Sequence, residues 1–178
     1  MLFKKELPIT NGLLRVLAFE DLHQGYVDGL NNPAVNQYLE VRRVRQTTKS
    51  VGAFIKNNIQ SSESVLWGIW SCDAPNHVGT IRIHGINNQF KHCHIGICIF
   101  CETAWGRNIG TNAIIAAINW AFSELGMCTV EAHAYLENVA SIRTFIKAGY
   151  LRLSDRFSIV PNESSPMPHG LLVKESYF

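Results

Sequence analysis

The sequence predicts one domain of the mixed α/β class, in which helices flank a mostly antiparallel sheet. Three strand-like segments, 65–71, 78–86 and 92–100, follow one another with short turns between them. That arrangement is typical of an antiparallel meander. A glycine-bearing turn then leads into a long helical pattern and into a further strand, 128–135. A strand–helix–strand crossover of this length usually makes its two strands parallel, so we expect one parallel pair in the sheet.

The composition limits the class of protein. The chain has 178 residues, of which 47% are hydrophobic and 17% charged, as in a soluble globular protein with one substantial core. A formal net charge of +2 is too small to favour nucleic acid or an acidic membrane surface as a partner. The chain has no apolar run of the roughly 20 residues that span a bilayer, and its N-terminus lacks the apolar core of a signal peptide. We therefore expect a cytoplasmic location.

The N-terminal part reads as a strand followed by two helices. Residues 13–18 form the strand, and the acidic pair at 20–21 suits the first turn of the helix after it. Asn32 is a natural N-cap and Pro33 a first-turn residue, which predicts a second, short helix through about Leu39.

A third helix is predicted from an N-cap at Thr47 or Thr48. Its apolar residues recur at helical spacing: Val51, Phe54, Ile55 and Ile59. Three arginines precede it: Arg42, Arg43 and Arg45. Two interpretations of this basic patch stay open, a solvated surface or a contact for an acidic or phosphorylated ligand.

The C-terminal part predicts two further helices and two strands. The helix after the glycine turn spans about 111–125, carries an apolar stripe and ends at Gly126, a natural C-cap. The stripe consists of Ile114, Ala117, Ile118, Ala121, Phe122 and Leu125. Asn138 opens the next helix, which buries Ile142, Phe145 and Ile146 and ends at Gly149. Two strands and a Pro- and Ser-rich loop between them complete the chain: 151–160, 161–170 and 171–178.

The turn at residues 105–111, Trp-Gly-Arg-Asn-Ile-Gly-Thr, is the centre of the functional argument. The first N–H groups of a helix have no internal partner, and the helix dipole adds positive potential at that end. Gly106 and Gly110 let the backbone turn tightly and approach a ligand closely. Such a turn predicts an anion site, above all for phosphate, although the same pattern also fits an ordinary strand-to-helix turn.

The cysteines predict free thiols and no metal site. Their odd number and the missing secretion signal argue against disulfides: Cys72, Cys93, Cys98, Cys101 and Cys128. Cys98 and Cys101 form a C-x-x-C, but residues three apart on a strand point to opposite faces. His92, His94 and Cys98 share a face, yet a buried, inert cysteine is the favoured interpretation over zinc.

Four motifs together resemble the GNAT superfamily of acetyl-CoA-dependent N-acetyltransferases: Ile95-Gly96-Ile97, the 105–111 turn, Asn138-Val139-Ala140-Ser141 and Ala148-Gly149-Tyr150. The most similar branch includes ribosomal-protein N-terminal and amino-sugar acetyltransferases. The resemblance covers almost the whole chain and implies a single domain, 1–178. It also implies a central sheet of about seven strands, in which strand 92–100 splays from strand 128–135. Members of the family often pair through strands near the C-terminus, which allows a homodimer.

The resemblance implies acetyl-CoA as co-substrate and a site for it. The pyrophosphate would lie on backbone N–H groups of the turn: Arg107, Asn108, Ile109, Gly110 and Thr111. The pantetheine arm would pair with the strand end before it: Ile97, Cys98, Ile99 and Phe100. Asn138 and Ser141 match positions that meet the cofactor beyond the thioester, although Asn138 is equally a natural N-cap. The family usually has glycine where this chain has Asn108, and asparagine tolerates left-handed backbone angles better than most residues.

An amine attacks a thioester in its neutral form. Deprotonation at neutral pH costs roughly 4–5 kcal/mol for a lysine amine and about 1 kcal/mol for an α-amine. An α-amine or a sugar amine is therefore the easier substrate for a weak base. His94 stands where the branch often has Glu and is our candidate base, the alternative being a structural histidine. Further candidates are His84, His92, Glu131 and His133.

Many family members carry a tyrosine, the general acid for the departing thiolate, where this chain has Phe145. That role then falls to Ser141, to a water or to no group, because a thiolate is a tolerable leaving group. The resulting hypothesis is direct transfer from acetyl-CoA to a primary amine in a ternary complex, without a metal or a covalent enzyme intermediate.

Two alternatives stay open. The first concerns the acceptor, for which we favour a protein N-terminal α-amine. A nucleotide-linked amino sugar or another small amine is the other candidate, and the basic patch and the aromatic residues could bind a nucleotide. The second alternative is a binding module that keeps the acetyl-CoA fold without turnover. Phe145 and Asn108 are the residues that favour it.

Overall fold

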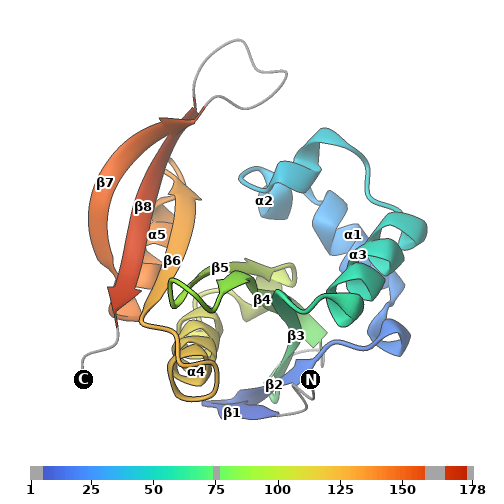
Figure 1. The fold of residues 1–178 in the computed structure, drawn as a ribbon. Helices are drawn as coiled ribbons and strands as arrows, with labels where there is room; N and C mark the ends of the chain where they lie inside the picture. The colour runs from blue at the N-terminus through green and yellow to red at the C-terminus, as the bar shows by residue number, and fades with distance from the viewer. Residues whose placement is uncertain (1–5, 74–76, 159–166, 176–178) are drawn as a thin grey trace.

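The computed structural model describes residues 6–73, 77–158 and 167–175 (Figure 1). Within them, eight strands form one sheet in the order β1-β2-β3-β4-β5-β6-β8-β7. The strands are β1 (Leu7–Ile9), β2 (Gly12–Val16), β3 (Ser64–Ser71), β4 (His77–Asn87), β5 (His92–Ile99), β6 (Thr129–Tyr135), β7 (Leu151–Ser158) and β8 (Met167–Glu175). The predicted mixed, mostly antiparallel sheet is confirmed, with β1 as a strand that the sequence pattern did not indicate.

Five α-helices and three short 3-10 turns connect the strands. The helices are α1 (Gln24–Asn31), α2 (Pro33–Asn36), α3 (Thr48–Gln60), α4 (Ile109–Ser123) and α5 (Val139–Lys147). The 3-10 turns are η1 (Phe19–Asp21), η2 (Glu40–Arg43) and η3 (Glu102–Ala104). No helix among the described residues is both long and apolar enough to cross a bilayer.

Strands β2 to β5 form the predicted antiparallel meander, and β5 and β6 form the predicted parallel pair. This parallel pair is short. The register joins His92 to Thr129, Cys93 to Val130 and His94 to Glu131, and the pairing stops there. On their outer sides, however, β5 stays paired with β4 as far as residue 99 and β6 with β8 as far as residue 135. The two strands therefore part beyond His94 and Glu131, as the family resemblance implied.

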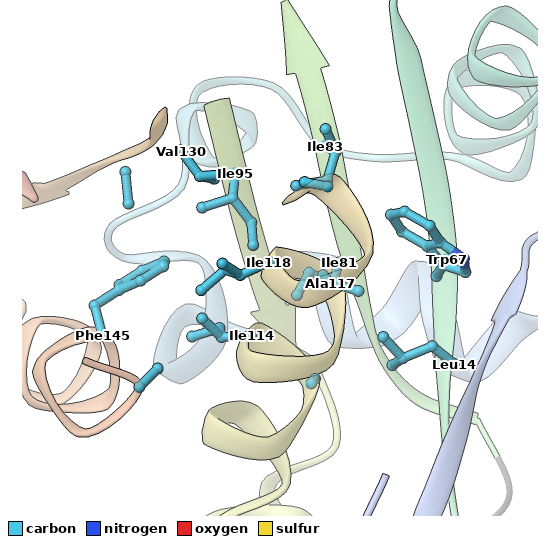
Figure 2. Close-up of a cluster of buried hydrophobic side chains, with 14 of the residues drawn as sticks. Leu14, Trp67, Ile81, Ile83, Ile95, Ile114, Ala117, Ile118, Val130 and Phe145 are labelled. Atoms are coloured by element: carbon cyan, nitrogen blue, oxygen red, sulfur yellow. The ribbon is translucent and has the colours of Figure 1, made fainter. Parts of the chain in front are cut away.

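The two faces of the sheet carry different cores. A first core lies between the sheet and helices α4 and α5 (Figure 2), and it includes Leu14, Trp67, Ile81, Ile83, Ile95, Ile114, Ala117, Ile118, Val130 and Phe145. A second, smaller core lies on the side of α1 and α3 and consists of Leu17, Tyr26, Val27, Leu30, Val51, Ile55, Leu66 and Phe100. The alternation of strand residues decides which face each side chain takes. In β4, Ile81 and Ile83 join the first core, so Arg82 and His84 point to the opposite face.

The predicted N-caps at Asn32 and Thr47 are confirmed, whereas helix α4 ends at Ser123 with Glu124, not Gly126, as its C-cap. The Asn32 side chain accepts a hydrogen bond from the Ala34 N–H at 3.0 Å, and Thr47 Oγ1 accepts from the Ser50 N–H at 3.1 Å. Gly126 adopts φ +62° just after α4, the left-handed angle that a glycine C-cap supplies.

Several boundaries differ from the sequence prediction. The helix expected at the acidic pair begins only at Gln24, because Asp21 accepts hydrogen bonds from Arg15 and from the Ala18 N–H, both at 2.8 Å, and closes a 3-10 turn instead. Helix α2 ends at residue 36 rather than near 39. Strand β8 begins at Met167, inside the predicted loop, while positions 159–166 and 176–178 lie outside the described residues.

Three apolar residues that the helical pattern assigned to the buried stripes are exposed: Phe54 at 39%, Ile59 at 54% and Ile146 at 49%. The other stripe residues of α3, α4 and α5 are buried or packed against the first core as expected. All five cysteines are free thiols, as predicted.

Candidate active site

Of the two glycines expected to shape the 105–111 turn, Gly106 has a left-handed backbone, whereas Gly110 lies inside helix α4 without a positive φ. Gly106 has φ +73°, and Asn108 has φ +59° and ψ 8°, so asparagine here takes the left-handed conformation itself. Helix α4 begins at the next residue, and its first internal bond runs from the Asn112 N–H to the Asn108 carbonyl at 3.0 Å. The N–H groups of residues 109–111 precede that bond and have no partner within the helix.

The Asn108 side chain does not cap helix α4. Its Oδ1 instead accepts a hydrogen bond from Lys147 Nζ at 3.0 Å, at the end of α5. The first turn of α4 is thus left uncapped, and a lysine ammonium group adds positive charge beside it. Both features favour an anion at this point. Sequence reasoning missed Lys147, since nothing local links the last turn of one helix to the start of another.

Two side chains fix the turn to neighbouring strands. Trp105 Nε1 donates to the carbonyl of Ile99 at 2.9 Å, at the last residue of β5. The Arg107 guanidinium donates to the carbonyl of Asp73 at 3.2 Å, beyond the end of β3. The start of α4 is therefore held at the far end of β5, the strand that parts from β6.

A cavity of about 520 Å³ opens on the α1/α3 face of the sheet, beside the parting strands. Its walls come from β4, β5 and β6, from α3, α5 and η2, and from α1. Four of the predicted cofactor contacts line this cavity: Ile97, Cys98, Asn138 and Ser141. Ile99 packs instead against the first core, and the Phe100 ring stacks on Tyr26 in the second core with centroids 4.8 Å apart. A cofactor contact at these two residues would therefore use the backbone.

Asn138 fills the capping role that the sequence also allowed. Its Oδ1 accepts a hydrogen bond from the Ser141 N–H at 3.1 Å and so begins helix α5. Because both side chains also line the cavity, the cap places the start of α5 against the space between the strands.

The candidate base lies in a cluster of imidazoles at the point where β5 and β6 part. His94 is directly opposite Glu131 on β6 and His84 on β4. His94 Nδ1 lies 3.8 Å from Glu131 Oε2, and His133 Nε2 lies 4.0 Å from the same oxygen. The ring centroids of His84 and His94 are 5.5 Å apart. His84 and His133 line the cavity, with the half-buried His94 on the strand between them.

The electrostatics separate His84 from the other candidates. Burial, the Arg82 guanidinium and the neighbouring His94 and His133 lower the pKa of His84 to about 4. His84 is therefore neutral at physiological pH but binds a proton only weakly, which makes it a poor general base.

The same cluster holds the one group of side chains in the described residues with the chemistry of a metal site. The ligand atoms of His94, Glu131 and His133 lie within 4.8 Å of one another, and two histidines with one carboxylate suit zinc and related ions. The group differs from the set weighed in the sequence, His92, His94 and Cys98. Burial raises the pKa of Cys98 to about 12, so its thiol holds the proton that a zinc ligand must lose.

Phe145, at the position where the family resemblance implied a tyrosine, is buried and lines the cavity. The Phe145 and Tyr150 rings pack edge to face, with their centroids 5.0 Å apart. The Tyr150 hydroxyl is buried without a hydrogen-bond partner among the described residues, and burial raises its pKa, so it keeps its proton.

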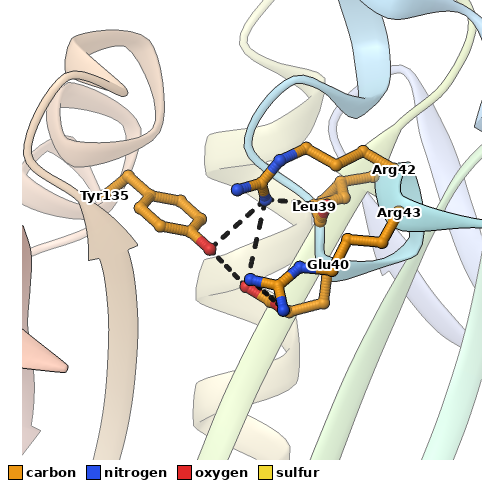
Figure 3. A network of polar contacts seen from close by, with 5 residues as sticks. All are labelled: Leu39, Glu40, Arg42, Arg43 and Tyr135. Atoms are coloured by element: carbon orange, nitrogen blue, oxygen red, sulfur yellow. Dashed lines mark hydrogen bonds and ion pairs between the residues drawn. The ribbon is translucent and has the colours of Figure 1, made fainter. Parts of the chain in front are cut away.

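Across the cavity, the segment η2 contacts β6 through a polar network (Figure 3). The Tyr135 hydroxyl donates to the Glu40 carboxylate, and Arg42 Nη1 lies 3.3 Å from the same hydroxyl oxygen. Arg42 and Arg43 also form ion pairs with Glu40, at 4.0 and 3.4 Å. Burial and the neighbouring Glu40 raise the pKa of Tyr135. Two arginines of the basic patch thus pair with a carboxylate, and Arg45 is exposed.

Comparison with known proteins identifies the family to which this arrangement belongs. A sequence profile described as "Acetyltransferase (GNAT) domain" matches residues 13–151. The N-acetyltransferase YoaA of Bacillus subtilis, named as uncharacterized, is 29% identical over 91 residues, which are 51% of this chain and 51% of that protein. The matched stretch thus spans about half of the curated relative.

Solved structures share the fold at low sequence identity. The ribosomal L7/L12 alpha-N-protein acetyltransferase RimL, in complex with coenzyme A, has a TM-score of 0.84 at 14% identity, covering 96% of this chain and 98% of that chain. A spermidine N-acetyltransferase from Vibrio cholerae, in complex with CoA and spermine, has a TM-score of 0.80 at 14% identity, with coverage of 93% and 95%. At these identities the likeness shows the fold alone.

Proposed function

The chain belongs to the GNAT family of acetyltransferases, and on that premise we propose that residues 1–178 form a single domain that transfers an acetyl group from acetyl-CoA to a primary amine. The favoured acceptor is a protein N-terminal α-amine. The amine attacks the thioester directly in a ternary complex, without a metal or a covalent enzyme intermediate.

One observation carries this proposal: β5 and β6 pair over three residues and then part, with the uncapped start of α4 at the far end of β5. The unpaired edge of β5 offers backbone groups to an extended arm, and the N–H groups of residues 107–111 offer donors to a diphosphate. Residues 97–100 and the pair Asn138 and Ser141 then flank the arm on its two sides. The left-handed Asn108 supports this assignment, because it gives the turn the conformation that glycine gives other members.

The proton chemistry is assigned to the cluster at the fork. His94 accepts the proton of the attacking amine, directly or through a water. The Glu131 carboxylate, whose Oε2 lies 3.8 Å from His94 Nδ1, stabilises the positive charge that the imidazole gains. Phe145 cannot return a proton to the thiolate, so Ser141, a water or no group serves there. Tyr150 packs against Phe145 rather than among the residues that line the cavity.

A nucleotide-linked amino sugar or another small amine is the second candidate acceptor. The solved relatives with the same fold include a protein α-amine acetyltransferase and a spermidine acetyltransferase, so the fold supports both kinds of acceptor. Tyr26, Tyr38 and Phe54 around the cavity favour a ring-bearing acceptor such as a nucleotide.

The test is to incubate the protein with labelled acetyl-CoA and three sets of acceptors: N-terminal peptides, nucleotide-linked amino sugars and polyamines. We expect labelled product with at least one set, and an unchanged rate after treatment with a chelator. Tight binding of acetyl-CoA without transfer to any amine would instead identify a binding module, and loss of the rate with the chelator would contradict the metal-free mechanism.

A further inference from the structure

Arg82 is a charged residue in the cavity that neither the sequence argument nor the proposed chemistry uses. It lies on β4, opposite Leu66 of β3 and Gly96 of β5, near the middle of the sheet. Strand alternation points its side chain away from Ile81 and Ile83 and into the cavity, whose wall it forms together with His84. The Arg82 Cζ lies 5.5 Å from the centre of the Phe54 ring.

The described residues offer Arg82 no counter-charge. Its Nε is buried without a hydrogen-bond acceptor, and no carboxylate in the described part of the chain forms an ion pair with it. Among the described residues that line the cavity, Glu40 is the one carboxylate, and it is already bound to Tyr135, Arg42 and Arg43. The cavity therefore presents a positive charge that no carboxylate of the described residues balances.

Such an arrangement is unfavourable for the free protein. Partial burial of a guanidinium removes water from it, and here that loss lowers its pKa. An arginine nevertheless keeps its charge, and its planar fork of donors matches a carboxylate or a phosphate group in two parallel hydrogen bonds. An unpaired arginine in a binding cavity thus indicates that the ligand supplies the anion.

We propose that the acceptor amine carries an anionic group, a carboxylate or a phosphate, and that Arg82 binds this group while the amine lies at the parting strands. The proposal rests on the proposed acetyl transfer and narrows its acceptor. It selects N-terminal peptides with an acidic side chain, or amino sugars with a nucleotide phosphate. It rejects polyamines, because every additional ammonium group would meet the Arg82 charge in a confined space.

The experiment measures kcat/KM for matched acceptors. The peptide pair is Ala-Glu-Ala-Ala and Ala-Gln-Ala-Ala with amidated C-termini, which differ by one negative charge. A UDP-linked amino sugar is compared with the same free amino sugar, and spermidine is the polycation. We expect the wild type to prefer the anionic member of at least one pair by ~10-fold or more, the range of a hydrogen bond to a charged group. The responsive pair distinguishes a carboxylate from a phosphate source.

Two variants of Arg82 test whether this side chain causes the preference for the anionic acceptor. Arg82→Gln should abolish the preference, because the rate falls more for the anionic member of the pair than for the neutral one. Arg82→Lys, which keeps the charge, should retain part of the preference. Lys56→Gln is the matched control, since it removes one positive charge from the exposed side of α3 and should leave the preference intact. The affinity of each variant for coenzyme A shows that it is folded.

The outcomes separate this proposal from the proposed function. Acetylation of neutral amines with no anion preference, a preference for spermidine, or an equal loss for all acceptors in Arg82→Gln would each overturn the role of Arg82 and leave the transferase intact. The absence of transfer to every amine, together with no affinity for coenzyme A, would overturn both.

Discussion

The two faces of the central sheet use the same strands for different purposes. On the α4/α5 face the strands present mainly aliphatic side chains, together with Trp67, to the first core (Figure 2). On the α1/α3 face the alternate residues of the same strands include Arg82, His84 and His133, which line the cavity. His94 and Glu131 lie beside them. The first set of residues stabilises the fold and the second is available for chemistry, because successive residues of a strand point to opposite faces of the sheet.

This division explains how the charged cluster is held in place. His94 and Glu131 are the last register partners before β5 and β6 part, so backbone pairing fixes them beside each other at the fork. On the opposite face of the sheet, the neighbouring residues of both strands are buried in the first core. We therefore expect substitutions on the two faces to affect different measurements.

The largest effect is expected on the polar face, at His94. Loss of a general base typically lowers the rate by ~10²–10⁴-fold, so His94→Ala should reduce kcat/KM by that range and leave the free energy of unfolding nearly unchanged. The pH profile of the wild type adds a second check. An acidic limb near pH 4 would identify His84, whose pKa is lowered to about 4, as the base in place of His94. A limb that disappears in His94→Ala supports our assignment.

The opposite pattern is expected on the apolar face, at Ile114. This side chain is fully buried in the first core, and its truncation to alanine should lower the free energy of unfolding by about 2–5 kcal/mol in a denaturant titration. The neighbouring Ile115 is 39% exposed and provides the matched control, with an expected loss below ~1 kcal/mol. Equal losses at the two positions would mean that the first core is not where the structure places it.

The smallest effect concerns a buried histidine away from the cavity, His77. Burial and the neighbouring His23, whose Nε2 lies 3.1 Å from His77 Nδ1, lower its pKa to about 4, from an ordinary value near 6.5. Between these two values the unfolded chain binds a proton that the folded chain does not, so stability falls as the pH falls. Between pH 8 and pH 5 His77 should account for about 2 kcal/mol of that loss.

The corresponding measurement follows the free energy of unfolding from pH 8 to pH 5 in the wild type and in His77→Gln. The variant should show a flatter dependence, because glutamine does not titrate. Asp21 and Arg15 act on the same imidazole in opposite directions and remain in both proteins. Parallel pH curves for the two proteins would rule out His77 as the source.

The sequence predicted the features that depend on local pattern. The alternation of strand residues and the turn residues predicted the antiparallel meander. The strand–helix–strand crossover predicted the parallel pair, and the glycine turn predicted where α4 begins. The three-residue strand β1 was not predicted, because Leu7–Ile9 is too short to show a hydrophobic period and contains Pro8. The exposed Phe54 fits the helical stripe of α3 but lies at the cavity, where no core covers it.

Contacts between distant segments could not be predicted in this way. The sequence named His94 and Glu131 separately, but their pairing depends on the register between two parallel strands, which no local pattern encodes. The same holds for the hydrogen bond between Lys147 and Asn108 and for the hydrogen bond between Tyr135 and Glu40. Arg82 shares its face with His84 by strand parity, a signal that was present in the sequence. That no carboxylate of the described residues pairs with Arg82 is visible only in the fold.

Calorimetric titration with coenzyme A and, separately, with pantetheine tests the central claim most directly. Pantetheine keeps the arm that would lie along β5 and lacks the diphosphate that would meet residues 107–111. If the open start of α4 holds the diphosphate, coenzyme A should bind tighter than pantetheine by at least ~100-fold, as two or more charge-assisted hydrogen bonds require. Equal affinity for the two compounds, or no affinity for coenzyme A, would contradict the account.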